Sequence, residues 1–217
     1  ITAILSTLKT DSLILAEENI YGCTYRLMDQ VFKKFGVSVE YIDFTLEKNI
    51  NSISDVKPDL IWIESPTNPM LKILDIESIS EVSKKIGSTL VVDNTFASSF
   101  VQTPLELGAD ISLLSLTKYS NGHSDALGGV VCCNDERWGD KMVFAQKALG
   151  LQPSPFDCWL IQRGLKTQAI RVERHSQNAK IMAEYLEERF PEAKILYPFL
   201  ESHPQYEMAK KQMRLGS

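Results

Sequence analysis

Lys118 stands among side chains that together suit covalent chemistry on a carbonyl compound. It follows the apolar run 111–114, which is typical of a buried strand. Ser115 and Thr117 come just before it, and Gly122 provides a turn just after it. The lysine amine can bond to a carbonyl carbon, and hydroxyl groups beside a glycine turn suit a phosphate. The stretch therefore predicts a site for a ligand that carries both groups.

A carboxylate adds a third feature to this predicted site. Asp93 follows the strand-like run 90–92 and stands 25 residues before Lys118. By itself such a residue caps a helix or closes a turn. Beside a reactive lysine it can keep a ring nitrogen protonated, so that the ring withdraws electrons. Pyridoxal 5′-phosphate (PLP) carries an aldehyde, a phosphate and such a nitrogen, and we predict it as the cofactor.

Two further residues have both a structural and a ligand-binding interpretation. Tyr21 precedes a glycine at the start of a helix-like segment, so its ring is either an ordinary aromatic or stacks on a flat ligand. Asn68 lies in the proline-rich turn 65–69, where its amide either satisfies backbone groups or donates to a cofactor oxygen. His123 and Asp125 lack a second pair of ligands at usable spacing, so we predict no metal site.

Length, charge and cysteine content narrow the class of protein. The 217 residues allow one large domain, or one domain and part of another. A hydrophobic content of 44% is ordinary for a globular protein, and the net charge of −5 argues against a dedicated nucleic-acid binder. No apolar stretch approaches the length of a membrane span, and the N-terminus lacks the basic leader of a signal peptide. Four irregularly spaced cysteines predict a reducing, cytoplasmic location.

Strand-like and helix-like segments alternate along the chain, which predicts an α/β fold with a mostly parallel sheet. Strands are predicted at 12–16, 37–42, 59–63, 90–92, 111–114 and 128–132, and helices at 24–35, 76–86, 141–149 and 163–190. The predicted inner side of the first helix is Leu27, Met28, Val31, Phe32 and Phe35. That of the last helix is Ile170, His175, Ile181, Met182, Tyr185 and Leu186.

A final strand-like run at 194–197 predicts the start of a new unit. We therefore expect a cofactor-binding large domain over residues 1–196. Residues 197–217 are then the beginning of a C-terminal domain.

Six segments carry a resemblance to a known family. They are 21–26, 64–69, 92–96, 115–125, 153–157 and 163–167. In this order they resemble the cysteine and methionine metabolism family of PLP-dependent enzymes, which have the aspartate aminotransferase-like fold, called fold type I. The likeness spans all 217 residues, and the segment around Lys118 is its most specific part.

The resemblance implies a role for each candidate residue. It implies that Lys118 bonds to the cofactor aldehyde and later moves protons, and that Asp93 pairs with the ring nitrogen. Tyr21 is expected to stack on the ring, to assist exchange of the amine and to contact the substrate. Ser115 and Thr117 are expected to bind the phosphate. Asn68 is expected to contact the ring oxygen, and Arg26 is expected to contact the substrate.

The same resemblance favours a carbon–sulfur lyase. Arg26 and the segments 121–125 and 153–157 match the members that cleave cystathionine to cysteine, 2-oxobutanoate and ammonia. Cys23 does not match this pattern, because the members that cleave cystathionine usually have glycine at this position. The members that cleave methionine have a reactive cysteine there. We rank cleavage of cystathionine by α,γ-elimination first, cleavage of methionine second and synthesis of cystathionine third.

The resemblance also implies parts that this chain lacks. It predicts a glycine-containing phosphate turn and a Tyr-x-Arg segment before residue 1, and a substrate-binding arginine beyond residue 217. It implies a homotetramer built from dimers whose subunits share active sites. The alternative of another class is a non-catalytic fragment or subunit of the same fold. Because every cofactor position in the chain is filled, we favour an enzyme.

Overall fold

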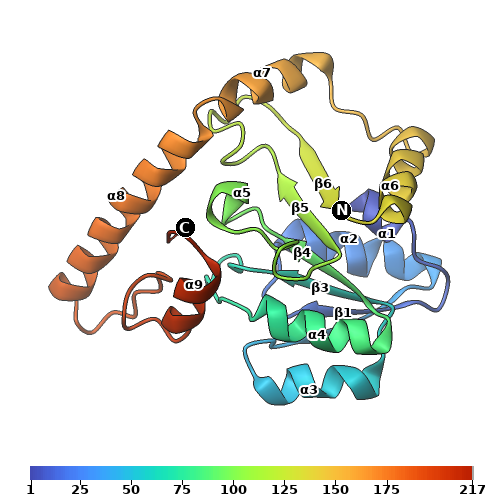
Figure 1. Ribbon diagram of the computed structural model, residues 1–217, viewed down its shortest axis with the longest axis horizontal. Coiled ribbons are helices and arrows are strands. Elements are labelled where there is room, and N and C mark those ends of the chain that lie inside the picture. Colours follow the sequence, from blue (N-terminus) through green and yellow to red (C-terminus); the bar gives the residue numbers. More distant parts are fainter. Residues whose placement is uncertain (217) are drawn as a thin grey trace.

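The computed structural model describes residues 1–216, and a six-stranded sheet forms its centre (Figure 1). The strands are β1 (Leu13–Glu17), β2 (Ser38–Ile42), β3 (Leu60–Glu64), β4 (Thr89–Asp93), β5 (Ile111–Ser115) and β6 (Gly129–Cys133). Their order across the sheet is β2-β1-β3-β4-β5-β6. The first five run parallel, and β6 pairs antiparallel with β5. The predicted α/β fold with a mostly parallel sheet is confirmed.

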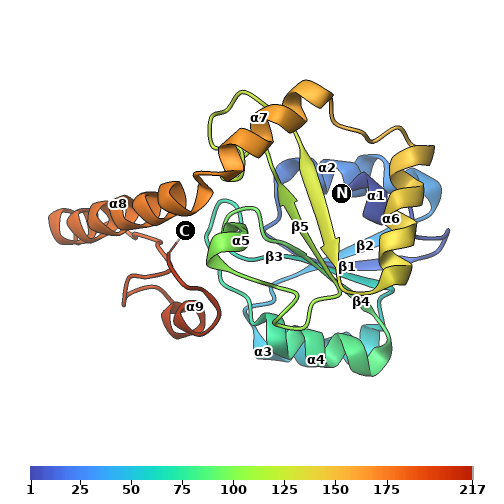
Figure 2. The same ribbon diagram turned by 45° about the horizontal axis from the view of Figure 1, so that its top comes forward.

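Helices cover both faces of this sheet. Those described are α1 (Thr2–Leu5), α2 (Gly22–Gln30), the 3-10 helix η1 (Phe32–Phe35), α3 (Glu47–Val56), α4 (Ile76–Ile86), α5 (Ser98–Val101), α6 (Glu136–Ala148), α7 (Pro155–Leu165), α8 (Gln168–Arg189) and α9 (Tyr206–Gln212). Side chains of α3 and α4 pack on one face, and those of α1, α2 and α6 pack on the other. Figures 1 and 2 show α8 extending away from the sheet.

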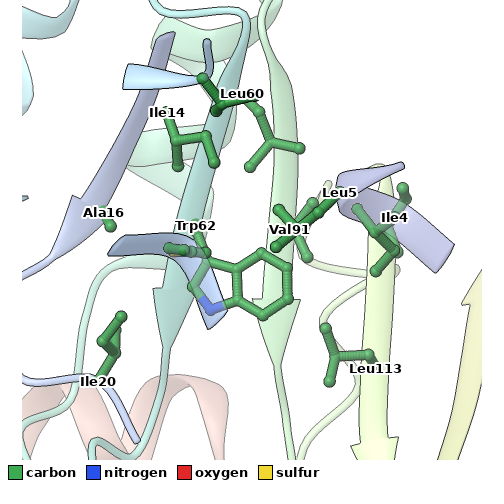
Figure 3. Close-up of a cluster of buried hydrophobic side chains, with 12 residues drawn as sticks. Ile4, Leu5, Ile14, Ala16, Ile20, Leu60, Trp62, Val91 and Leu113 are labelled. Atoms are coloured by element: carbon green, nitrogen blue, oxygen red, sulfur yellow. The ribbon is translucent and has the colours of Figure 1, made fainter. Parts of the chain in front are cut away.

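Alternation along each strand assigns its side chains to the two faces. Trp62, Val91 and Leu113 lie in the core on the side of α1 and α2. Figure 3 shows the Trp62 indole at the centre of that cluster. Ile61 and Val92, one position away in sequence, lie in the core on the side of α3 and α4. Since successive residues alternate, the strand-end residues two positions beyond Trp62, Val91 and Leu113 belong to the side of α1 and α2.

Local signals set the bounds of α4. The Asp75 side chain accepts a hydrogen bond from the Ser78 backbone N–H, and so caps the first turn. Gly87 follows the last helical residue with φ 74°, a left-handed conformation that glycine adopts without strain. The helix predicted at 76–86 is confirmed at both ends.

The single helix predicted at 24–35 is wrong in its second half. Helix α2 ends at Gln30, and the 3-10 helix η1 follows until Gly36. A 3-10 helix has three residues per turn, so the apolar stripe expected from a continuous α-helix is not kept. Met28 is fully buried as predicted, whereas Val31 and Phe35 are exposed.

The long helix predicted at 163–190 is in fact two helices, α7 and α8, separated at residues 166–167. Its predicted inner side is also wrong. Ile170, Ile181, Met182 and Tyr185 are exposed, and the buried residues of α8 are Gln168, Val172, Ser176 and Ala183. Helix α8 projects beyond the sheet (Figure 1), and only a narrow stripe of its side chains is buried, which leaves its larger apolar residues exposed.

Two other elements differ from the prediction. The strand expected at 194–197 is not formed, and these residues follow α8 as irregular chain. Tyr197 and Leu200 pack with Ala183 of α8 instead. Helix α3 was not predicted, because its apolar positions Ile50 and Ile53 are few and stand among polar residues. The domain boundary expected after residue 196 stays a prediction.

Gly164 is held in contact with the backbone of another segment, which gives a test of the packing. A Cβ at this position would lie 2.1 Å from the Asn121 carbonyl oxygen. We expect Gly164→Ala to lower the free energy of unfolding by about 1–3 kcal/mol, as overpacking does. The matched control is Gly139→Ala inside α6, where a Cβ meets no atom within 4 Å.

For the control we expect a gain of about 0.5–1 kcal/mol, because alanine has the higher helix propensity. Urea denaturation of both variants measures the difference. Equal stabilities would contradict the close contact between α7 and the turn after β5.

Candidate active site

The carboxyl ends of three adjacent strands form the base of the site. Glu64 ends β3 and is paired in register with Asp93, which ends β4. Asp93 is paired in turn with Leu113 of β5, so Ser115 lies two positions further along the same edge. Ligands of α/β proteins bind at this edge. Parallel pairing therefore gathers side chains that are far apart in the sequence.

A cavity of about 1020 Å³ opens at this edge. It brings together six of the predicted site residues, which are Tyr21, Asn68, Asp93, Ser115, Thr117 and Lys118. Residues of α1 and α6 complete its wall, among them Thr2 and Met142. The seventh predicted residue, Arg26, is not part of the described lining.

Asp93 lies deep in the site, with 9% of its surface exposed. Its carboxylate accepts hydrogen bonds from the Thr95 backbone N–H at 2.9 Å and from the Thr95 hydroxyl at 2.5 Å. The same hydroxyl accepts from the Ser115 backbone N–H at 2.9 Å, which ties the end of β5 to Asp93. Burial raises the pKa of Asp93, and the hydrogen bonds from Thr95 partly offset this.

Glu64 is a second buried carboxyl group that sequence reasoning did not single out. It is 4% exposed, lines the cavity, and accepts the Tyr21 backbone N–H with both oxygens at 2.9 Å. Desolvation, followed by the charge of Asp93, raises the pKa of Glu64 to about 8. The only local signal was an acidic residue at the end of the apolar run 60–63.

Tyr21, Cys23 and Arg26 meet at the start of α2. The Arg26 Nη2 donates to the Cys23 Sγ at 3.0 Å. A hydrogen bond between Tyr21 and Cys23 raises the pKa of Tyr21 and lowers the pKa of Cys23. All three side chains are exposed, and Tyr21 reaches the cavity. The structure therefore places the unexpected cysteine in contact with two predicted site residues.

Lys118 lies on a turn between β5 and β6. Its backbone N–H donates to the Ser115 carbonyl, and its carbonyl accepts from the Gly122 N–H at 2.7 Å. Thr117 Oγ1 accepts the Gly128 N–H at 3.1 Å, which joins the turn to the start of β6. Lys118 also borders a second cavity of about 720 Å³, whose walls include Asp125 and His175.

Three acidic residues near the ends of β1 and β2 surround a lysine rather than reach the cavity. Glu17, Glu18 and Asp43 have carboxylate oxygens close enough to bind one cation. The Lys72 Nζ lies 3.6, 2.9 and 3.0 Å from them, respectively. The single ammonium charge offsets part of the negative charge of this cluster and occupies the space between the three carboxylates. Among the described helices, none is long and apolar enough to cross a membrane.

Known proteins resemble this chain over most of its length. A model of the family described as Cys/Met metabolism PLP-dependent enzyme matches residues 1–217. A cystathionine gamma-lyase of Sus scrofa is 44% identical over 94% of the chain and 51% of its own length. A cystathionine beta-lyase of Coxiella burnetii is 43% identical over 97% of the chain and 55% of its own.

A solved structure shows the same fold. The cystathionine gamma synthase of Xanthomonas oryzae pv. oryzae in complex with cystathionine has a TM-score of 0.91 and 36% identity. The match covers 98% of this chain and 55% of that one. The fold and the cavity define a fold type I protein, and the chain belongs to the Cys/Met metabolism PLP-dependent enzyme family. It spans about half the length of the curated relatives it matches.

The donor and acceptor groups of the cavity fit the cofactor of this family. Among the described residues Asp93 is hydrogen-bonded to Thr95 and forms no ion pair with a lysine or arginine side chain. A buried carboxylate of this kind is a suitable partner for a protonated ring nitrogen. A primary amine, two hydroxyl groups and an aromatic ring line the same cavity.

The raised pKa of Glu64 gives a pH test of the site. In the unfolded chain its carboxyl group ionises near pH 4.5, whereas in the folded protein it stays protonated until about pH 8. Between these values the folded state holds the extra proton, so stability falls as pH rises, by at most about 1.4 kcal/mol per unit for this group.

We expect Glu64→Gln to flatten this dependence, because the amide is neutral and its oxygen still accepts the Tyr21 N–H. Urea denaturation at several pH values from 5 to 8 measures it, and exposed Glu40→Gln on β2 is the control, with the wild-type slope expected. Parallel curves for wild type and Glu64→Gln would show that Glu64 is ionised throughout.

Proposed function

We propose that the intact protein is a PLP-dependent carbon–sulfur lyase that cleaves cystathionine. The reaction consumes one water and yields cysteine, 2-oxobutanoate and ammonia by α,γ-elimination. The observation that carries the proposal is the cavity that gathers Lys118, Asp93 and Tyr21 at the carboxyl edge of the sheet. Similarity to a cystathionine gamma-lyase over 94% of the chain supports the choice of substrate.

The residues of the cavity would hold PLP in the way the sequence predicts. Lys118 would bond to its aldehyde carbon, and Asp93 would face the ring nitrogen. Ser115 and Thr117, which line the cavity, would bind the phosphate, and Asn68 would contact the ring oxygen. The aromatic ring of Tyr21 would stack on the cofactor ring. When bound, PLP supplies an electron-withdrawing ring next to the α-carbon of the substrate.

The protein's own groups would then move the protons. Lys118 Nζ, once free, removes the proton from the substrate α-carbon and returns a proton later in the reaction. The Tyr21 hydroxyl, which lies beside the Cys23 thiol, would assist exchange between the Lys118 amine and the substrate amine. Asp93 would hold the ring nitrogen in its protonated form, because a nearby carboxylate favours a positive charge. Arg26 is proposed to bind the substrate from the start of α2.

Cys23 favours a second candidate, the cleavage of methionine. The family resemblance implies a reactive cysteine at this position in the members that cleave methionine. In the structure the Cys23 thiol contacts Arg26, and its pKa is lowered by its contacts with Tyr21 and Arg26. Synthesis of cystathionine by γ-replacement ranks third, supported by the likeness to the gamma synthase of Xanthomonas oryzae pv. oryzae.

The proposal includes an assembly and a compartment. We propose a cytoplasmic homotetramer with active sites shared between subunits. Exposed apolar side chains on three neighbouring helices support an assembly, and they include Phe144 on α6, Phe156 on α7, and Ile170 and Ile181 on α8. The large domain would end at residue 196, and residues 197–217 would begin a second domain.

Replacement of Lys118 tests whether this residue binds the cofactor. We expect the wild-type protein with added PLP to show a visible absorbance band that borohydride bleaches. Lys118→Ala should lack the band, because the amine that bonds to the aldehyde is gone. Lys180→Ala, on the exposed part of α8, is the control and should keep it. Absence of the band from the wild-type protein would contradict the proposal and favour a non-catalytic subunit.

The products formed from two substrates separate the candidate reactions. With cystathionine we expect 2-oxobutanoate and cysteine in equal amounts, measured by chromatography of the reaction mixture. Pyruvate and homocysteine would indicate the β-elimination named for the Coxiella burnetii relative. Release of methanethiol from methionine at a higher kcat/KM than cystathionine cleavage would support the second candidate. If the protein bound PLP but formed none of these products, the lyase assignment would be overturned.

A further inference from the structure

Arg171, near the start of α8, is in contact with the turn that carries Lys118. Its Nη1 donates to the Tyr119 carbonyl at 2.9 Å, and its Nη2 lies 3.4 Å from the Ser120 carbonyl. These are the two residues that directly follow Lys118. Nη2 also donates to the Gly164 carbonyl at 2.8 Å. One guanidinium group thus joins the lysine turn to the end of α7.

The same guanidinium group is fixed to its own helix. The Arg171 Nε donates to the Thr167 Oγ1 at 3.0 Å, one turn earlier. All these acceptors are uncharged oxygens, and burial lowers the pKa of Arg171. A planar group with donors on both edges can satisfy such divergent acceptors at once, whereas a lysine ammonium cannot reach all of them.

The guanidinium group also packs directly against the backbone of the turn at Gly122. A Cβ at Gly122 would lie 1.9 Å from the Arg171 Nη1, and Gly122 has φ 75°, which favours glycine. The Gly122 N–H in turn closes the turn on the Lys118 carbonyl. Arg171 is not among the lining residues of either cavity beside Lys118, so any effect on the site passes through the turn.

We propose that Arg171 is a positioning residue for Lys118. By holding the Tyr119 and Ser120 carbonyls, it fixes the turn so that the Lys118 amine meets the aldehyde carbon of PLP. In that reaction the amine nitrogen forms a double bond to the carbon, and the aldehyde oxygen leaves as water. The inference rests on the proposed function, because it assumes that Lys118 bonds to the cofactor.

The experiment compares two forms of the cofactor on Arg171→Lys in the full chain. PLP bonds to Lys118, whereas pyridoxamine 5′-phosphate has an amine in place of the aldehyde and occupies the cavity without that bond. We expect the rate of bond formation with PLP, followed by absorbance, to fall roughly 10- to 100-fold, as misplaced reacting groups do. The affinity for pyridoxamine 5′-phosphate should change by less than about threefold, since the contacts of the cavity remain.

Two further samples sharpen the comparison. Arg174→Lys changes an exposed arginine three residues later on α8 and should behave as wild type. Arg171→Ala should bond to PLP slowly, and added guanidinium ion should restore part of its rate. A failure of the wild-type protein to bond to PLP would instead refute the proposed function.

Three results would overturn the inference itself. One is a wild-type rate of bond formation in Arg171→Lys. Another is a parallel loss of affinity for both cofactor forms, which would indicate general loosening of the site. The third is a failure of Arg171→Lys to fold, which would make Arg171 a residue of global stability.

Discussion

The burial of two carboxyl groups at one edge of the sheet is the constraint around which this structure is arranged. Parallel pairing of β3 and β4 places Glu64 and Asp93 in register, where a charge without partners is costly. The Tyr21 backbone N–H satisfies Glu64, and Thr95 satisfies Asp93 while also accepting from Ser115. The start of α2, the turn after β4 and the end of β5 are therefore tied to these two groups. The cavity lies where the three segments meet.

The amine of the site is held by a separate set of contacts. Lys118 follows β5 on a turn that Thr117 joins to β6 and that Arg171 joins to the helices α7 and α8. The sheet thus positions the side of the cavity that carries Glu64 and Asp93. The helices after β6 support the side that carries Lys118. The two sides approach each other because β5 contributes to both, through Ser115 and through the turn that follows. This arrangement brings groups from distant parts of the sequence to one cavity.

Much of this could be predicted from the sequence wherever the signal is local. Helix α4 was predicted to the residue from its helix-like spacing and the glycine that follows it, and the strands were found within about two residues because they are short apolar runs between turns. Six predicted site residues line the cavity, and they were predicted from strand ends, hydroxyl groups and the family resemblance. The features that could not be predicted depend on contacts between residues far apart in the sequence. The importance of Glu64 follows from its register with β4, and the contacts of Arg171 follow from the path of α8. The prediction of which face of α8 is buried was wrong, because the largest apolar side chains of this helix are exposed.

The central claim is that this edge of the sheet binds PLP between Lys118 and Asp93. A crystal structure of the protein with PLP tests it most directly. The account predicts continuous electron density from the Lys118 Nζ to the cofactor, with the ring nitrogen facing the Asp93 carboxylate. A cofactor bound elsewhere, or one whose ring nitrogen points away from Asp93, would contradict it.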